Sequence, residues 1–220
     1  GDYDADGVSG AALLYSLFRK LGIKEYLDVY IPDRNREGYG VNMKGVSELA
    51  ERNTKLIITV DCGLSNHEEI KHAKLLGIDI VICDHHLTPE INPPAYAVVN
   101  PKAKDSGYPF PHLSGTGVAF KLAEAILQSY PPEFLETLGI KKGFEKWFLD
   151  LVAIATVADR MSLTLENRMF VKYGLIVMAQ TRRLGLRMLL VRAGIVPWFD
   201  FSNLATNLTT QDLSFTVIPR

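Results

Sequence analysis

The first half of the chain alternates short apolar runs with segments of helical periodicity. The two clearest runs, KLIITV at residues 55–60 and IDIVIC at residues 78–83, are rich in Val and Ile and lack a regular polar alternation. Such runs are typical of strands in a parallel sheet that helices cover on both faces. We therefore expect an α/β fold with a parallel β-sheet flanked by helices. Its strands are predicted at residues 26–31, 55–60, 78–83 and 95–99, and its helices at residues 7–21, 42–52 (capped by Asn42) and 65–76.

The second half of the chain has a mainly helical pattern. Helices are predicted at residues 113–130, 144–158 and most of 165–193, with breaks at Gly174 and Gly185. A Pro-Pro pair opens a predicted linker at residues 131–143, and a short β-like segment is predicted at residues 215–218. We expect residues 1–130 to form an α/β catalytic core and residues 131–220 to form a mainly helical continuation of the same domain.

Composition limits the class of protein further. The net charge of −1 excludes a globally basic nucleic-acid binder but allows a local basic groove. No apolar run approaches the roughly 20 residues that span a bilayer, so we expect no membrane association. Two cysteines, Cys62 and Cys83, end apolar strands, which favours buried thiols in a reducing cytoplasm. Because the chain opens without Met on an acidic motif, we expect it to be a fragment cut at both ends.

The opening motif DYDADG carries carboxylates at alternate positions, Asp2, Asp4 and Asp6. In an extended chain these side chains point the same way, and like charges that gather without a cation are costly. An acidic turn with a helix cap is the simplest alternative. The loop of an EF-hand is a second alternative, but it needs an acidic residue at its twelfth position, which is Leu13 here.

Further polar clusters follow the predicted strands and one predicted helix. Asp61 follows the first buried run, the triplet Asp84-His85-His86 follows the second, and Asp159 ends the helix before residue 160. A lone Asp at a strand end is often a helix cap. Two adjacent parallel strands would nevertheless bring Asp61 and His85 side by side, at the edge where such sheets bind ligands. Carboxylates with a few imidazoles suit two Mn²⁺ or Mg²⁺ ions, which support in-line displacement at phosphorus.

The segments DYDADG, VDCG, CDHH and TVADR, in this order, resemble the motifs of the DHH phosphoesterase family over essentially the whole chain. The resemblance implies the metal ligands Asp4, Asp6, Asp61, His85 and Asp159, with Asp61 bridging two ions and Asp2 assisting. It also implies that His86 lies by the scissile phosphate and that Asp84 orients the histidines. From the resemblance we expect the family's C-terminal DHH-associated domain to lie outside this chain.

Other segments resemble the RecJ-type single-strand exonucleases within this family. They are residues 31–34 (IPDR) with 37–40 (EGYG), 113–119 (LSGTGVA), 166–168 (ENR), 173–175 (YGL) and 215–220 (FTVIPR). This resemblance implies a 5′-to-3′ exonuclease on single-stranded DNA, acting in repair and recombination. Arg34 and Arg220 would hold the 5′-phosphate, and Tyr39 would stack on a base. The alternatives are solvated arginines and a packed tyrosine. For the arginines of residues 182–192, a solvated helix face is the preferred interpretation.

Two other functions remain open from the sequence. One is a small-substrate member of the family, an oligoribonuclease, cyclic-dinucleotide phosphodiesterase or pyrophosphatase, against which the RecJ-like segments weigh. The other is an inactive scaffold that binds DNA or a protein, against which the complete set of carboxylates and histidines weighs. Replication or repair partners would bind through regions outside this chain.

Overall fold

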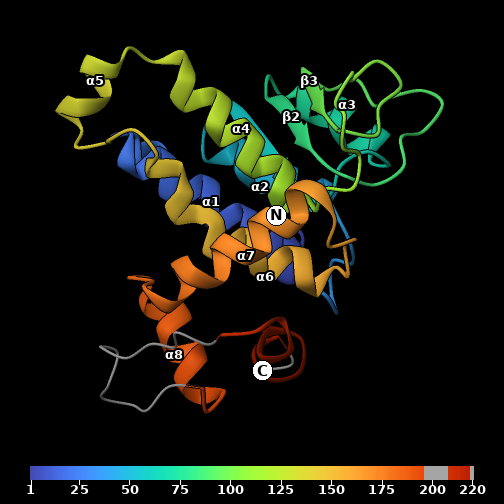
Figure 1. Cartoon of the computed structure of the whole chain (residues 1–220). Helices are drawn as coiled ribbons and strands as arrows, with labels where there is room; N and C mark the ends of the chain where they lie inside the picture. Colours follow the sequence, from blue (N-terminus) through green and yellow to red (C-terminus); the bar gives the residue numbers. More distant parts are fainter. Residues whose placement is uncertain (196–207, 219–220) are drawn as a thin grey trace.

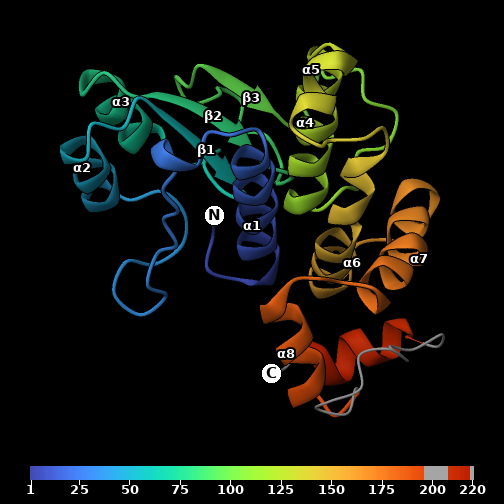
Figure 2. The same cartoon turned by 90° about the vertical axis from the view of Figure 1, so that its left-hand side faces the viewer.

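Three parallel strands form the centre of the N-terminal half in this computed structural model, which describes residues 1–195 and 208–218. The sheet has the order β1-β2-β3 (Figure 2), with strands β1 (Leu56–Val60), β2 (Asp79–Cys83) and β3 (Ala97–Val99). Val60 pairs with Cys83, and Cys83 pairs with Val99. The three strands therefore end level with one another. The residue after each strand lies at the same edge of the sheet.

Alternate strand residues enter hydrophobic clusters on opposite faces of the sheet. Ile80 and Ile82 of β2 pack into a cluster with α2 (Met43–Glu51) and α3 (His67–Leu75). Val60 and Cys83 pack into a second cluster with α1 (Ala5–Lys20) and α4 (Gly115–Ser129). Figure 2 shows α2 and α3 on one side of the sheet and α1 and α4 on the other. This arrangement confirms the predicted parallel sheet flanked by helices, and explains why the strands lack a regular alternation of polar and apolar residues.

The described residues in the second half of the chain are mainly helical, as predicted. The apolar helix α6 is buried between α1, α4 and α7, while α8 and a C-terminal π-helical segment η3 form a third hydrophobic cluster with α6 (Figure 1). In the described residues, none of the helices is long and apolar enough to cross a membrane. The elements are α5 (Pro132–Thr137), η2 (Phe144–Phe148), α6 (Leu149–Ala158), α7 (Leu165–Ala179), α8 (Leu184–Arg192) and η3 (Asp212–Val217).

Three predicted segments have a different structure. Residues 26–31 are not a strand: they follow a short 3₁₀ turn, η1 (Lys24–Tyr26), and Tyr26 is 87% exposed. The predicted linker contains α5, which begins at Pro132. Proline is tolerated at this first helical position because a backbone N–H there would have no partner within the helix. Residues 215–218 are helical or in a turn rather than β-like, since Leu213 and Val217 share one buried face of η3.

The predicted breaks at Gly174 and Gly185 are also wrong. Gly174 lies inside α7, where a side chain would collide with the Leu149 carbonyl and with Cβ of Ala153 at 2.5 Å. The glycine therefore allows α6 and α7 to approach closely. Gly185 lies in the first turn of α8, and the real break between the two helices falls at residues 180–183.

Candidate metal centre

Asp61 and the Asp84-His85-His86 triplet lie at the C-terminal edge of the sheet, directly after β1 and β2. The Asp61 backbone lies in the left-handed region, with φ at 62°, which is rare for a residue with a side chain. Its amide donates to the Cys83 carbonyl at 2.9 Å, and its carbonyl accepts from the Tyr39 hydroxyl at 2.6 Å. These contacts hold a strained residue in place, and strain of this kind is typical of functional sites.

The opening acidic motif reaches the same edge of the sheet, although its backbone is not extended throughout as expected. The Asp2 amide donates to the Val60 carbonyl at 3.2 Å, so the chain enters alongside β1. Asp4 is the N-cap of α1, and its carboxylate accepts the amides of Asp6 and Gly7 at 2.9 and 3.0 Å. Helix α1 therefore begins within the motif, at Ala5, with Asp2 and Asp4 before the helix and Asp6 in its first turn.

Asp6 is buried against the N-terminus of α4. Its two carboxylate oxygens accept the amides of Gly115 and Thr116, both at 2.7 Å. Gly115 also lies close to Asp61, since a Cβ at this position would come within 2.6 Å of the Asp61 Cβ. The sequence did not identify these two amides as part of the site. The only signal for them was the glycine-containing segment at residues 113–119.

His85 is the point at which the carboxylates meet. Its Nε2 atom lies 3.1 Å from Asp61 Oδ1, 3.5 Å from Asp159 Oδ2 and 3.8 Å from Asp6 Oδ2. Asp6 lies in α1, Asp61 follows β1, and Asp159 is the C-cap of α6. The three carboxylates around His85 therefore come from three separate elements. Ligand atoms of Asp6, His85 and Asp159 lie within 4.8 Å of one another, a separation that one metal ion can bridge.

Two further groups of potential ligand atoms contain Asp61. Asp2, Asp4 and Asp61 form one group, and Asp61, His85 and His86 form the other, each again within 4.8 Å. All six residues predicted from the sequence as metal ligands are therefore brought together at this edge of the sheet.

The donor set fits a hard divalent cation. Asp61 Oδ1 and both ring nitrogens of His85 are buried without a hydrogen-bond partner among the described residues, although buried polar atoms are usually paired. Burial, followed by the charges of Asp6 and Asp4, raises the pKa of Asp61 to about 9. Burial lowers the pKa of His85, which favours the neutral imidazole that a metal requires. Oxygen ligands with few nitrogens suit Mn²⁺ or Mg²⁺.

His86 faces a different environment from that of His85. Its Nδ1 atom lies 2.7 Å from Asp84 Oδ1, and its side chain is about half exposed. The hydrogen bond to Asp84 raises the pKa of His86. Burial opposes ionisation of Asp84, but hydrogen bonds from His86 and from the His85 amide outweigh it and lower the pKa of Asp84. The pair therefore favours a charged imidazolium beside the cluster.

The residues expected to contact nucleic acid are less fully described. Tyr39 and His86 line a hollow of about 220 Å³, and the Tyr39 hydroxyl lies 3.4 Å from His86 Nδ1. Tyr39 therefore borders the cluster while retaining an exposed ring face. Arg34 is exposed, and its guanidinium lies over the ring of Tyr3 at 5.2 Å. Arg220 lies outside the described residues.

The fold and this cluster define an α/β domain that gathers potential ligands for a divalent metal at the ends of its parallel strands. The chain belongs to the DHH family, because that family's N-terminal domain matches residues 1–156.

The chain is similar to the single-stranded-DNA-specific exonuclease RecJ of Bacillus subtilis, with 43% identity over 194 residues. That match covers 88% of this chain and 23% of the relative. The whole chain matches a crystal structure of exonuclease RecJ bound to manganese, with a TM-score of 0.77 and 32% identity. This match covers 50% of that structure's chain. RecJ from Thermus thermophilus in complex with Mn²⁺ matches the whole chain with a TM-score of 0.72 and 29% identity, and 28% of that protein is covered. The chain therefore spans a quarter to a half of these relatives.

Proposed function

We propose that this chain is the catalytic core of a two-metal phosphodiesterase that degrades single-stranded DNA from its 5′ end. The observation that carries the proposal is the convergence of two ligand groups, Asp6–His85–Asp159 and Asp2–Asp4–Asp61, on the unpaired Asp61 and His85 atoms. The manganese in similar RecJ structures, and the activity in the RecJ name, support the choice of metal and of reaction.

In this proposal the ions are Mn²⁺ or Mg²⁺. The residues that would hold them are Asp4, Asp6, Asp61, His85 and Asp159, with Asp61 contributing to both sites and Asp2 assisting. When bound, two divalent ions neutralise charge on the phosphate oxygens and activate water for in-line attack. Asp6 is held for this role by the Gly115 and Thr116 amides, so its carboxylate needs no reorganisation when an ion binds.

His86 is the proposed acid beside the scissile phosphate. The hydrogen bond to Asp84 raises the pKa of His86, and the ring is exposed enough to meet a substrate in the hollow that it lines with Tyr39. From this position His86 would donate a hydrogen bond or a proton to the leaving oxygen. Tyr39 would support a base, and its hydroxyl already fixes the Asp61 backbone.

The remaining assignments rest on resemblance. Arg34 and Arg220 would bind the 5′-phosphate of the DNA end, because guanidinium groups pair with phosphate in a bidentate way. Residues 1–130 would form the catalytic core, and residues 131–220 its helical continuation. We place the activity in cytoplasmic DNA repair and recombination, with protein partners bound outside this chain.

A panel of substrates tests this proposal. The purified chain would be assayed with Mn²⁺ on five substrates, each at the same total concentration of phosphate groups. They are 5′-labelled single-stranded DNA, 3′-labelled single-stranded DNA, the same sequence in RNA, a dinucleotide and pyrophosphate. Early release of labelled mononucleotide from the 5′-labelled DNA, with late release from the 3′-labelled strand, is expected. Inert long DNA with rapid cleavage of the dinucleotide or pyrophosphate would instead assign the chain to the small-substrate branch. Binding of DNA without hydrolysis of any substrate would indicate a scaffold.

A further inference from the structure

The first turn of α7 contains an asparagine that is completely buried. Asn167 is 0% exposed, and its side-chain amide donates to two backbone carbonyls, that of His112 at 2.6 Å and that of Ser162 at 3.0 Å. The two acceptors lie on different segments, one leading into α4 and one leading out of α6. The Asn167 side chain therefore links the loop before α4 to the loop between α6 and α7.

One of these loops carries Asp159. Helix α6 ends at this residue, and the chain then crosses residues 160–164 before α7 begins at Leu165. Arg160 and Leu165, at the two ends of the crossing, have φ of 54° and 43°, a left-handed conformation that residues with side chains rarely adopt. Ser162 lies between them. The Asn167 contact therefore holds the middle of a loop that is strained at both ends.

The other loop is firmly anchored. Three residues after His112, the amides of Gly115 and Thr116 hold Asp6, and Ser114 caps α4 with its side chain. The His112 carbonyl is therefore a fixed point just before α4, the helix whose first amides hold Asp6. Through Asn167, the position of Ser162 is set relative to this fixed point.

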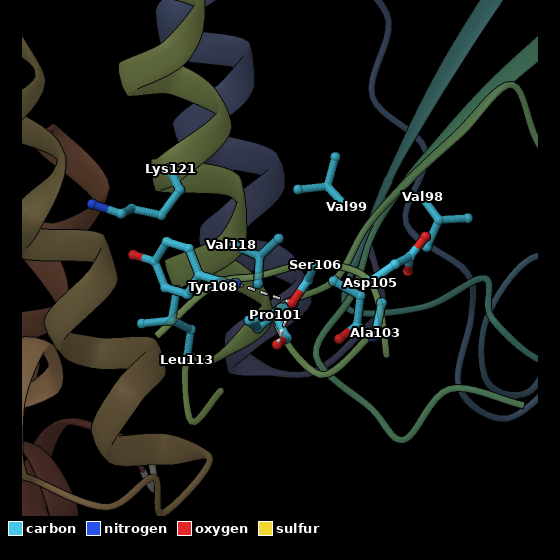
Figure 3. A pocket seen from close by; sticks show the side chains of 11 residues that line it. Val98, Val99, Pro101, Ala103, Asp105, Ser106, Tyr108, Leu113, Val118 and Lys121 are labelled. Atoms are coloured by element: carbon cyan, nitrogen blue, oxygen red, sulfur yellow. Dashed lines mark hydrogen bonds between the residues drawn. The ribbon is translucent and has the colours of Figure 1, made fainter. Parts of the chain in front are cut away.

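Glu166, the neighbour of Asn167, strengthens the same attachment. It accepts the Tyr108 hydroxyl at 2.7 Å and pairs with Lys121 of α4 at 3.2 Å. Figure 3 shows Tyr108 and Lys121 lining a cavity of about 320 Å³, with the Tyr108 hydroxyl and the Lys121 ammonium group both directed away from Val99. Neither contact of Glu166 touches residues 160–164, so this residue anchors α7 and leaves the Asp159 loop to Asn167.

We propose that Asn167 is a positioning residue for metal binding and acts through Asp159. By fixing the Ser162 carbonyl, it keeps the Asp159 carboxylate within reach of His85 and Asp6. The inference rests on the proposed metal ligands. It assigns a physical role to the ENR segment at residues 166–168, which the proposed reaction does not otherwise use.

Calorimetric titration of the metal-free protein with Mn²⁺ tests this role. Asn167→Asp is nearly isosteric but cannot donate to the two carbonyls, and Asn167→Ala keeps the test informative if the aspartate variant fails to fold. Loss of groups that orient a ligand typically weakens metal binding 10- to 100-fold, and we expect a loss of about that size for at least one ion. Phe170→Leu is the matched control, because Phe170 lies about one turn further along α7, where it packs on Phe120 of α4. Its Mn²⁺ affinity should stay within about threefold of wild type.

A double-mutant cycle tests the route through Asp159. In an Asp159→Ala background, Asn167→Ala should change the Mn²⁺ affinity by less than about threefold, because its target is already absent. Binding as tight as wild type in both Asn167 variants would overturn the inference. An equal loss in Phe170→Leu, or an undiminished effect without Asp159, would also overturn it. Absence of Mn²⁺ binding by the wild-type chain would overturn the proposed metal centre as well, so the two failures are distinguishable.

Discussion

The Nε2 atom of His85 lies 3.1 Å from Oδ1 of Asp61, yet neither atom has a hydrogen-bond partner among the described residues. Both side chains are buried, and both arise at the ends of adjacent parallel strands. Burying two polar atoms this close without a hydrogen-bond partner for either is costly. A divalent cation between them would remove that cost, which is why this pair is the centre of the proposed site.

The first prediction concerns pH and metal affinity. The folded pKa of Asp61 is raised to about 9 from 3.8, so the folded, metal-free protein holds a proton that the unfolded chain releases above about pH 4. The contribution of Asp61 to the free energy of unfolding therefore falls as pH rises from about 4 to about 9. An ion must displace this proton, so Mg²⁺ affinity should rise by about tenfold per pH unit between pH 6 and 8.

Calorimetric titrations with Mg²⁺ at several pH values, in buffers of different ionisation enthalpy, measure both the affinity and the proton release. The Asp61→Asn variant serves as the control, since it has no proton to displace at this position and should show a shallower pH dependence. A wild-type affinity that is constant from pH 6 to 8, with no protons released, would contradict this assignment.

A second prediction concerns Asp84 and the charge of His86. Asp84→Asn removes the negative charge that raises the pKa of His86, so less of the imidazole is protonated at neutral pH. The rate of DNA hydrolysis should fall by at least about a hundredfold, and its decline on the basic side should move to lower pH. A pH–rate profile measures this shift. If the basic limb stays where it is in the wild type, His86 is not the acid.

A third prediction compares two glycines in helices. Gly174→Ala should lower the free energy of unfolding by about 1 to 3 kcal/mol, because the new methyl group would press on Leu149 and Ala153 of α6. Gly185→Ala meets nothing within 4 Å and should raise the same quantity by up to about 1 kcal/mol. Urea denaturation of the two variants measures both effects. Equal effects of the same sign would contradict the close packing of α6 and α7.

A fourth prediction concerns an ion pair far from the metal centre. Asp150 is 1% exposed and accepts from Arg183 Nε at 3.2 Å and from the Thr181 hydroxyl at 2.8 Å. Arg183→Met should lower the free energy of unfolding by about 3 kcal/mol, because it leaves the Asp150 carboxylate buried without its cation. Arg182→Met, at the exposed neighbouring position, should change it by less than about 0.5 kcal/mol. Similar losses in the two variants would show that the pair does not stabilise the fold.

Much of the sheet and of the metal centre could be predicted from the sequence. Continuous Val and Ile runs allow few structures other than buried parallel strands, and the ends of such strands meet at one edge. Asp61 and His85 follow directly from that geometry. The cysteines were also predicted correctly as buried, and burial raises the pKa of both thiols to about 12.

The contacts made across long sequence separations could not be predicted. The amides that hold Asp6 lie more than a hundred residues away on α4, and propensity does not encode such an approach. Gly174 was misread because a glycine needed for close packing and one that ends a helix look the same in sequence. Arg183 was expected on a solvated face, and only its tertiary contact with Asp150 reveals a structural role.

Mn²⁺-dependent digestion of 5′-labelled single-stranded DNA by the wild type and by Asp61→Asn is the decisive measurement for a metal-dependent nuclease centred on Asp61. We expect release of mononucleotides by the wild type and a rate about a thousandfold lower for Asp61→Asn, because several kcal/mol of transition-state stabilisation is lost. Asp79→Asn, an exposed carboxylate at the start of β2, should digest DNA as the wild type does. Undiminished digestion by Asp61→Asn, or digestion by the wild type in excess chelator, would contradict a metal-dependent nuclease centred on Asp61.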